Sequence, residues 1–475
     1  MGKYKISEFF IYQKRNLIGY TLVALGLIGT LIFISLFLPG GITNSEIQSV
    51  LKSNSIYILD YWSMDVINLP YHLFQHTSFY FLGISIFSIK LPSLILAFLS
   101  AIGMVLLLKQ WFKTNIAVLT SLIAITTSQF LFIAQNGTSD ILYLFWPVWI
   151  IYIASLIPTI KKFRKFYIAI LFILASLSLY TPLSIYIIIV IAGAILIHPH
   201  LRYLVKQLSR LELFGGLIIA LLLISPLIYA IYKNPSLCLT LFGFPTSWPN
   251  IGSNLSSLAA QYLSFANPGG TTMITPFFEL GSILLIVLGA YFVLINKSTA
   301  KNYLVILWII FLIPIIILNP KYTTITFLPL VLLLASGLNG LLSHWYGLFP
   351  RNPYARVSGL IPVIILVTFL VFSGVNRYVF EYRYNPNMVP NFNKDLLLIP
   401  NNTKNIVVSD KELAFYNVIS KYNKKLTIST KPISDTFLVT RDAKQSIKGY
   451  EIVRIITSPN MNGSNRLYIY KKIAI

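Results

Sequence analysis

The chain has 475 residues, of which 56% are hydrophobic and only 11% are charged, and its formal net charge is +23. Soluble domains carry about 25% charged residues, so this composition excludes an ordinary soluble protein and indicates a polytopic membrane protein. The excess of cations then reflects membrane topology, and no nucleic-acid partner is expected. The single cysteine, Cys238, excludes an intrachain disulfide.

The chain begins with a basic segment, residues 1–16, and a long apolar run at about 17–38. This run is too long for a signal-peptide core and no small-residue cleavage site follows it, so we expect a retained first helix with a cytoplasmic N-terminus. Further apolar runs predict about eleven transmembrane helices in a domain that covers residues 1–376. They lie near residues 91–108, 115–134, 139–158, 167–181, 182–198, 213–232, 279–296, 302–319, 322–342 and 357–375.

The distribution of Lys and Arg agrees with this topology. The predicted cytoplasmic segments hold seventeen of these residues and the predicted outer loops hold four, as the positive-inside rule requires of a multi-pass protein of the cell membrane. If the apolar segment 69–85 also crossed the membrane, every later loop would change sides. We therefore expect it to lie at the outer interface as a partly buried helix.

The first outer loop, residues 40–90, is rich in ionisable residues. Seven acidic residues precede the last hundred residues of the chain, and three of them lie in this loop together with two histidines: Glu46, Asp60, Asp65, His72 and His76. Clusters of this kind in membrane proteins commonly mark functional sites. Aromatic residues typical of a membrane interface flank the two aspartates, so they are either catalytic or simply solvated loop acids.

Glu46 admits two interpretations. Residues 43–46 (TNSE) match a capping box, in which Glu46 reaches back to the start of a helix. The same carboxylate, held at the membrane surface, could serve as a general base. His72 and His76 would share a helix face, and with Asp140 they leave a divalent metal site open, although their spacing alone is weak evidence.

Asp140, Lys90 and Lys321 also have two interpretations each. Asp140, between two apolar runs, is either a helix N-cap or a catalytic carboxylate. Lys90 and Lys321 either extend harmlessly to the interface or bind a lipid phosphate. The chain has no Walker motif and no Rossmann glycine pattern, so nucleotide-driven chemistry is not expected.

The composition changes after about residue 377. The last hundred residues contain sixteen Lys and Arg, seven acidic residues and no apolar run long enough to span a membrane. β-rich runs at 405–409, 426–430, 436–440, 452–457 and 466–470, with a helix at 411–421 capped by Asp410, predict a small α/β domain over residues 377–475. An odd number of spans places this domain outside the cytoplasm.

The order of these motifs resembles the GT-C glycosyltransferases of the dolichyl-phosphate-mannose–protein mannosyltransferase and aminoarabinose transferase type. The matching segments are Ser45-Glu46, residues 65–71 (DVINLPY), Leu82-Gly83, residues 90–93 (KLPS), residues 134–146 (AQNGTSDILYLFW) and residues 319–338 (NPKYTTITFLPLVLLLASGL). The resemblance covers most of the membrane part. The chain departs from the family where Ser45 replaces the acid usually taken as catalytic, and where Thr138 stands in place of a basic residue.

The resemblance implies an integral-membrane glycosyltransferase that moves a hexose or pentose from a polyprenyl-phosphate-linked donor to an acceptor hydroxyl outside the cytoplasm, with inversion. The acceptor (protein, glycan or lipid) stays open. The candidates for catalysis are Glu46, Asp65 and Asp140. The candidates for substrate binding are His72, His76, Lys90, Lys321 and Tyr322. Some family members need a divalent metal, for which His72, His76 and Asp140 are the candidates, and no other cofactor is implied.

Two other functions compete with this one. A flippase or transporter of lipid carriers would place ionisable residues at mid-membrane, whereas the acids here cluster at one end. A relative without catalytic activity, serving as a scaffold, is consistent with Ser45.

Overall fold

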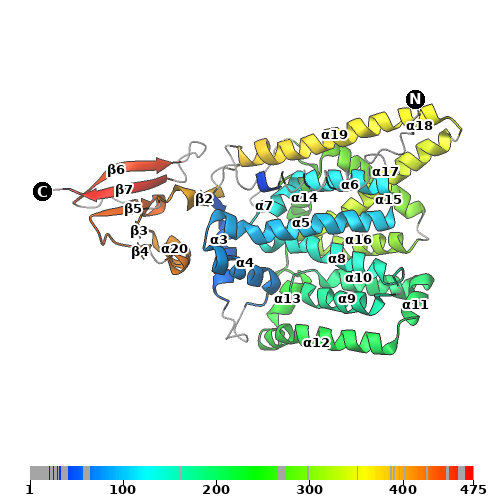
Figure 1. Cartoon of the computed structure of the whole chain (residues 1–475), viewed down its shortest axis with the longest axis horizontal. Coiled ribbons are helices and arrows are strands. Elements are labelled where there is room, and N and C mark those ends of the chain that lie inside the picture. Colours follow the sequence, from blue (N-terminus) through cyan, green and yellow to red (C-terminus); the bar gives the residue numbers. More distant parts are fainter. Residues whose placement is uncertain are drawn as a thin grey trace, which may run out of the picture.

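The computed structural model describes residues 21, 25, 29, 31–33, 41–56, 65–160, 162–265, 274–296, 299–349, 351–385, 388, 391–394, 396–400, 402–423, 426–444, 449–457 and 466–473. Most of the predicted first span, as well as Asp60, lies outside these residues. A helical bundle forms the larger part of the molecule, and a small mixed sheet projects from one end of it (Figure 1).

Two short helices of the first outer loop lie between the bundle and the sheet. Strand β1 (Ile42–Thr43) leads into α3 (Asn44–Asn54), and α4 (Leu69–Leu82) follows. With fourteen residues, α4 is shorter than the roughly 20 residues that a spanning helix needs. Its N-cap, Asn68, has a left-handed φ of 57°, and its C-cap, Gly83, also has a positive φ.

Six helical segments of the described chain are long and apolar enough to cross a membrane, or eight if each of two bent pairs counts as one span. The six are α5 (Ile86–Trp111), η2 with α8 (Ser139–Leu156), α12 (Arg210–Lys233), α16 (Ala300–Leu318), η3 with α17 (Pro320–Leu348) and α19 with η4 (Leu360–Arg383). The bent pairs are α6 (Thr114–Thr126) with α7 (Ser128–Gln135), at 60°, and α10 (Ile185–Ile197) with α11 (Pro199–Lys206), at 99°.

The described residues thus give fewer spans than the eleven predicted. Two of the predicted spans form shorter helices, α9 (Arg164–Ser178) and α15 (Leu280–Ile295), of 15 and 16 residues. The remaining short helices of the bundle are α13 (Ser236–Phe242), α14 (Ile251–Leu263) and α18 (Pro353–Ser358).

The second half of the bundle contains one very close helix crossing. A Cβ placed on Gly289 of α15 would lie 1.8 Å from the carbonyl oxygen of Leu333 on α17, and one placed on Gly337 would lie 2.0 Å from that of Leu285. Small residues of this kind let backbones approach without side chains between them. Because α17 is among the most buried spans, this contact fixes the helix that carries η3.

The C-terminal part forms a five-stranded sheet in the order β4-β3-β5-β7-β6. Its elements are β3 (Asn405–Val407), α20 (Asp410–Tyr422), β4 (Thr427–Ser429), β5 (Thr436–Thr440), β6 (Tyr450–Thr457) and β7 (Arg466–Lys472), with the short helical turns η6 (Leu396–Leu398) and η7 (Arg441–Ala443). β3 is parallel to β4 and β5, and β7 is antiparallel to β5 and β6. Ser409, not Asp410 as predicted, is the N-cap of α20, since its backbone N–H donates to the Glu412 carboxylate.

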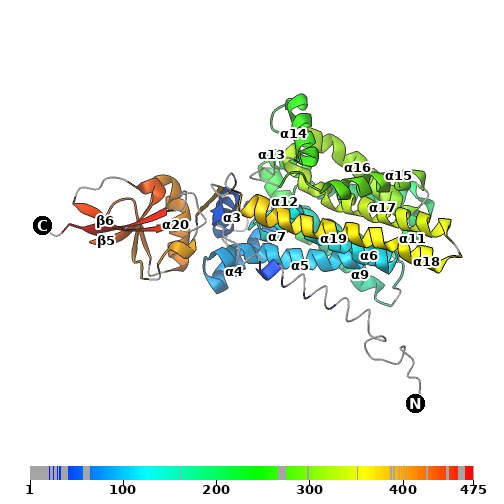
Figure 2. The same ribbon diagram turned by 90° about the horizontal axis from the view of Figure 1, so that it is seen from above.

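The C-terminal part is attached to the first outer loop. Strand β2 (Phe392–Lys394) pairs antiparallel with β1, immediately before α3. Apolar side chains of α3, α4 and α20 share one buried cluster, and Lys421 of α20 donates to Asn54 of α3. Both views place α3 and α4 between the bundle and the sheet (Figures 1 and 2).

Candidate functional site

Glu46 is almost completely buried, with 1% of its surface exposed. Its Oε2 accepts hydrogen bonds from the backbone N–H of Thr43 at 2.8 Å and from the Thr43 hydroxyl at 3.0 Å, while the N–H of Glu46 donates to Thr43 Oγ1. The predicted capping box is therefore confirmed. Oε1 accepts from the backbone N–H of Gly137 at 2.8 Å and lies 3.8 Å from Lys90 Nζ. Both carboxylate oxygens of Glu46 therefore accept hydrogen bonds from within the protein.

Ser45 and Glu46 point to different surroundings. Neighbouring residues at a helix start are about 100° apart around the axis. Ser45 is exposed, whereas Glu46 faces the protein interior. The position at which the resemblance expects the catalytic acid is therefore accessible and carries no carboxylate. Lys90, a predicted phosphate ligand, is also buried. Its ammonium faces the carboxylate of Glu46 in the protein interior.

Gln75 joins α3, α4, α5 and the turn after α7. Its side-chain amide donates to the carbonyl oxygens of Ile89 and Gly137, at 2.9 and 3.1 Å. Its Oε1 accepts from the hydroxyls of Ser49 and Ser53. A fully buried amide with all these partners is a rigid junction. The sequence analysis missed Gln75, because a glutamine in an apolar helix gives no spacing signal of its own.

His72 also belongs to this network. Its Nδ1 lies 2.8 Å from the Ser53 hydroxyl. Because that hydroxyl donates its proton to Gln75, Nδ1 of His72 carries a hydrogen and is the donor. Burial, with a contribution from the nearby Lys52 charge, lowers the pKa of His72 from 6.5 to about 4. His72 is therefore neutral at pH 7.

The predicted metal ligands do not come together. His76 Nδ1 lies 2.9 Å from the carbonyl oxygen of Ser53 and therefore donates to it. Asp65 is exposed, pairs with Lys52 at 2.9 Å and accepts from the N–H of Ile67. No group of three or more His, Cys, Asp and Glu side chains in the described part of the chain could hold a metal ion. The set of His72, His76 and Asp140 therefore does not fit a divalent metal.

Asp140 lies at the end of the bundle nearest the first loop, inside the short helix η2 (Ser139–Ile141). Thr138, not Asp140, occupies the N-cap position, so the predicted capping role is wrong. The Thr138 hydroxyl donates to Asp140 Oδ2 at 2.8 Å. The side chain of Asp140 is partly exposed, and it interacts electrostatically with Lys321.

Aromatic and amide groups surround this carboxylate. The rings of Tyr143 and Tyr322 lie 6.1 Å apart, edge to face. Tyr143 also interacts electrostatically with the Asp140 carboxylate. Asn68 donates to the Ser139 hydroxyl at 2.8 Å. Its own Oδ1 is buried and has no hydrogen-bond partner within the described ranges. The fold thus brings Asp140, Lys321 and Tyr322 together from segments that are far apart in the sequence.

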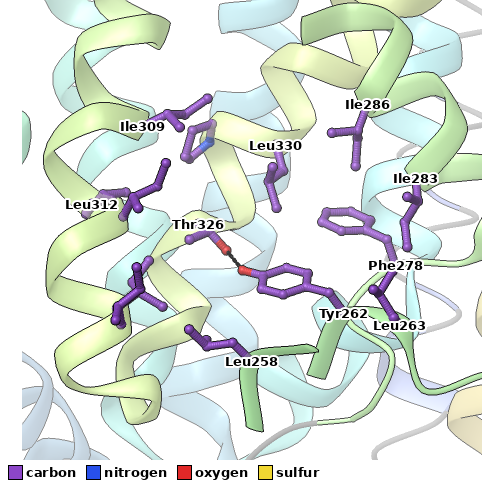
Figure 3. A pocket seen from close by; sticks show the side chains of 14 residues that line it. Leu258, Tyr262, Leu263, Phe278, Ile283, Ile286, Ile309, Leu312, Thr326 and Leu330 are labelled. Carbon is purple, nitrogen blue, oxygen red and sulfur yellow. Dashed lines mark hydrogen bonds between the residues drawn. The ribbon is translucent and has the colours of Figure 1, made fainter. Parts of the chain in front are cut away.

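An apolar groove of about 310 Å³ lies beside this cluster, between α14, α15, α16 and α17 (Figure 3). Its lining includes Leu258, Phe278, Ile286, Leu312 and Leu330. Its few polar groups include the hydroxyls of Tyr262 and Thr326, which are 2.6 Å apart. Thr326 ends η3 (Pro320–Thr326), the same short helix that begins with Pro320 and Lys321. One helix therefore connects the groove to the cation beside Asp140.

Residues 70–229 match the family described as dolichyl-phosphate-mannose-protein mannosyltransferase. This segment runs from α4 to α12 and includes Asp140, whereas Glu46 and Lys321 lie outside it. No curated protein matches the chain.

The fold is similar to that of three solved structures. ArnT from Cupriavidus metallidurans in the apo state has a TM-score of 0.52 at 11% identity, over 96% of this chain and 98% of that one. ArnT from the same organism bound to undecaprenyl phosphate has a TM-score of 0.56 at 9% identity, over 95% and 98%. The Archaeoglobus fulgidus oligosaccharyltransferase tethered with an acceptor peptide has a TM-score of 0.54 at 12% identity, over 88% of this chain and 64% of its own. The resemblance to GT-C proteins is thereby confirmed for the fold.

Proposed function

We propose that this chain is an integral-membrane glycosyltransferase. It transfers a sugar from a polyprenyl-phosphate-linked donor to an acceptor hydroxyl, on the side of the membrane that carries the C-terminal sheet. The proposal rests on one observation above all: Asp140 interacts electrostatically with Lys321, and the η3 helix that carries Lys321 and Tyr322 ends at Thr326, which lines an apolar groove. A lipid-linked sugar has an apolar tail, a charged phosphate and a polar sugar, and these three parts require an apolar surface, a cation and a carboxylate in that order.

The groove and η3 account for donor binding. The first isoprene units of the tail lie against the groove, and the ammonium of Lys321 faces the phosphate. Lys321 lies near the start of η3 and Thr326 at its end, so one short segment carries both the cation and a hydroxyl of the groove. The ArnT structure with undecaprenyl phosphate supports a ligand of this class for the fold.

Asp140 is the base in this proposal. Its carboxylate takes the proton of the acceptor hydroxyl, whose oxygen attacks the anomeric carbon while the bond from that carbon to the phosphate oxygen breaks. The leaving phosphate keeps the electron pair, and Lys321 stabilises its negative charge. A single displacement of this kind inverts the anomeric configuration. Asp65, exposed and paired with Lys52, is the alternative base.

The buried candidates have positioning roles. Glu46 holds the turn that leads to Asp140 through the Gly137 N–H, and Lys90 faces the Glu46 carboxylate. His72 and His76 fasten α4 to α3 through Ser53. No step passes through a metal, because the described His and acidic side chains form no suitable group.

The test measures release or transfer of a radiolabelled hexose or pentose from polyprenyl phosphate by the purified full chain. We expect Asp140→Asn to lower turnover by about 100-fold, the usual contribution of a general base. Lys321→Met should weaken the binding of unsugared polyprenyl phosphate. Asp435→Asn serves as the matched control, since Asp435 is an exposed carboxylate of the C-terminal sheet, paired with Lys472.

The outcomes separate the competing functions. Full turnover of Asp140→Asn with loss in Asp65→Asn would move the base to Asp65. Saturable lipid binding without turnover of any donor would identify a non-catalytic scaffold. Absence of lipid binding in the wild type would refute the proposal.

A further inference from the structure

A second pocket lies at the other end of the bundle, remote from Asp140. It has a volume of about 400 Å³ and lies between the end of α5, the last turn of α15, the first turn of α16 and the second half of α17. Helix α18 follows α17, and both views show it at the end opposite the C-terminal sheet (Figures 1 and 2). Lys301 of the pocket lies in the first turn of α16, whereas Lys321 comes after the last residue of this helix, Leu318, so the pocket and Lys321 lie at opposite ends of α16.

Most of the described residues that line this pocket are polar, and the others are Phe112, Phe292, Val293 and Gly340. The lining includes two residues that can carry positive charge, three amides and three hydroxyls: Lys301, His344, Asn296, Asn302, Asn339, Thr299, Ser336 and Ser343. Among the described residues that line the pocket there is no Asp or Glu. A pocket of donors and cations without a carboxylate is suited to an anion rather than to a metal ion or an amine.

Lys301 supplies the charge. Its side chain is half-buried, and its ammonium donates to the carbonyl oxygen of Trp111 at 3.2 Å and lies 4.5 Å from the centre of the Phe112 ring. An ammonium has three N–H donors. The hydrogen bond to Trp111 uses one of them, so the Lys301 ammonium can donate further hydrogen bonds to a ligand. Lys301 is also the second residue of α16, and the N-terminus of a helix adds a partial positive charge at the same place.

Exposed apolar side chains adjacent in sequence to lining residues indicate where the anion comes from. Leu294 and Ile295 at the end of α15, and Leu341 on α17, are exposed next to lining residues of the pocket. In a membrane protein such side chains contact acyl chains, so the polar pocket opens at the level where the apolar surface ends. That is the depth at which lipid headgroups lie.

We propose that this pocket binds a phosphate group, supplied by the headgroup of an anionic phospholipid in the leaflet opposite the C-terminal sheet. Lys301 and the N-terminus of α16 provide the charge. The Asn339 amide provides further donors, as does the second N–H of Asn302, whose amide also donates to the carbonyl oxygen of Asn296. The site goes beyond the proposed glycosyl transfer, and it is tested by lipid binding alone.

The experiment uses the purified, delipidated full chain in detergent. The unfolding temperature is followed while phosphatidylglycerol, phosphatidylcholine or inorganic phosphate is added, and native mass spectrometry counts retained lipids. We expect phosphatidylglycerol to stabilise the chain saturably and phosphatidylcholine not to. Lys301→Met should weaken the interaction about tenfold, the effect of one charge-assisted hydrogen bond.

A second variant separates binding from folding, because Lys301 also supports the end of α5. Asn339→Asp leaves Lys301 in place and adds a negative charge to the pocket, so the protein should stay folded and lose the effect of phosphatidylglycerol. Lys113→Met, an exposed cation at the start of α6 outside the lining, should retain it.

Inorganic phosphate could stabilise the wild type as phosphatidylglycerol does, with both effects lost in the two pocket variants. That result would support the phosphate site and show that it also accepts free phosphate. Equal responses to phosphatidylglycerol in the wild type and Asn339→Asp would overturn the proposal.

Discussion

Glu46 accepts a hydrogen bond of 2.8 Å from the backbone N–H of Gly137, although 91 residues separate the two. The bond connects the start of α3 to the turn after α7. Asp140 follows three residues later, in the short helix that this turn introduces. The buried carboxylate of Glu46 thus holds the backbone segment that carries the partly exposed carboxylate of Asp140. This relationship, together with the burial of Glu46, is the reason we propose a positioning role for Glu46 and a catalytic role for Asp140.

Changing Glu46 to Gln should destabilise the protein. The amide can still accept from Gly137, but the negative charge that faces Lys90 at 3.8 Å is removed. Breaking a buried ion pair costs about 3–5 kcal/mol, so thermal unfolding in detergent should begin at a clearly lower temperature. The double variant Glu46→Gln/Lys90→Met removes both charges and should recover much of the loss. A normal unfolding temperature of Glu46→Gln with no sugar transfer would instead restore Glu46 as the base.

A methyl group at Gly137 should disturb the same turn. A Cβ there would lie 2.7 Å from Ile89 Cγ2, 3.0 Å from the Ile89 carbonyl oxygen and 3.3 Å from Glu46 Oε1. Overpacking of this kind costs about 1–3 kcal/mol, and it should displace Asp140. We expect Gly137→Ala to lose both stability and sugar transfer.

Gly215→Ala on α12 is the matched control for Gly137→Ala, because a methyl there meets nothing within 4 Å. It should behave like the wild type in both assays. Unaltered transfer by Gly137→Ala would show that the turn tolerates the shift and that Asp140 does not depend on it.

Acidification should weaken the contact between α3 and α4 through His72. Its pKa is about 4 in the folded protein and about 6.5 when exposed. As the pH falls from 6.5 to 4, the unfolded state binds a proton that the folded state does not, so stability decreases throughout this window and the loss is complete near pH 4. The lowering of the His72 pKa from 6.5 to about 4 corresponds to a loss of about 3 kcal/mol in the free energy of unfolding.

The measurement compares unfolding temperatures of the wild type and His72→Gln between pH 7 and pH 4. Glutamine cannot titrate, so the decrease should be smaller in the variant, while all other groups titrate equally in both. Parallel curves for the two proteins would contradict the assignment of a buried, neutral His72.

Filling the apolar groove should block the lipid tail. Ile313 lines the groove on α16 and is half exposed, so Ile313→Trp can occupy the space with little cost to folding. We expect weaker binding of polyprenyl phosphate, measured by the shift in unfolding temperature that the lipid produces. Ile310→Trp is the control, since Ile310 is equally exposed on the same helix and does not line the groove. Equal weakening in both variants would argue against the groove.

The sequence by itself determined the class of protein, the capping box at Glu46 and the resemblance to GT-C proteins. Each of these depends on local chemistry. Long apolar runs cannot remain in water, and a Thr with a Glu three residues later satisfies the N–H groups of its own helix start. The β-rich runs after residue 405 likewise coincide with strands of the structure, because alternation of side chains is a property of the strand itself.

Only the tertiary structure decided which ionisable groups meet. Glu46 and Lys90 face each other in the interior, Asp65 pairs with Lys52 at the surface, and Asp140 interacts electrostatically with Lys321. The sequence placed Glu46 and Asp65 together because they share a loop. Proximity in the fold instead depends on which face of each helix is buried and on breaks such as the 60° bend between α6 and α7. Such pairings depend on packing between distant segments, and no local pattern encodes them.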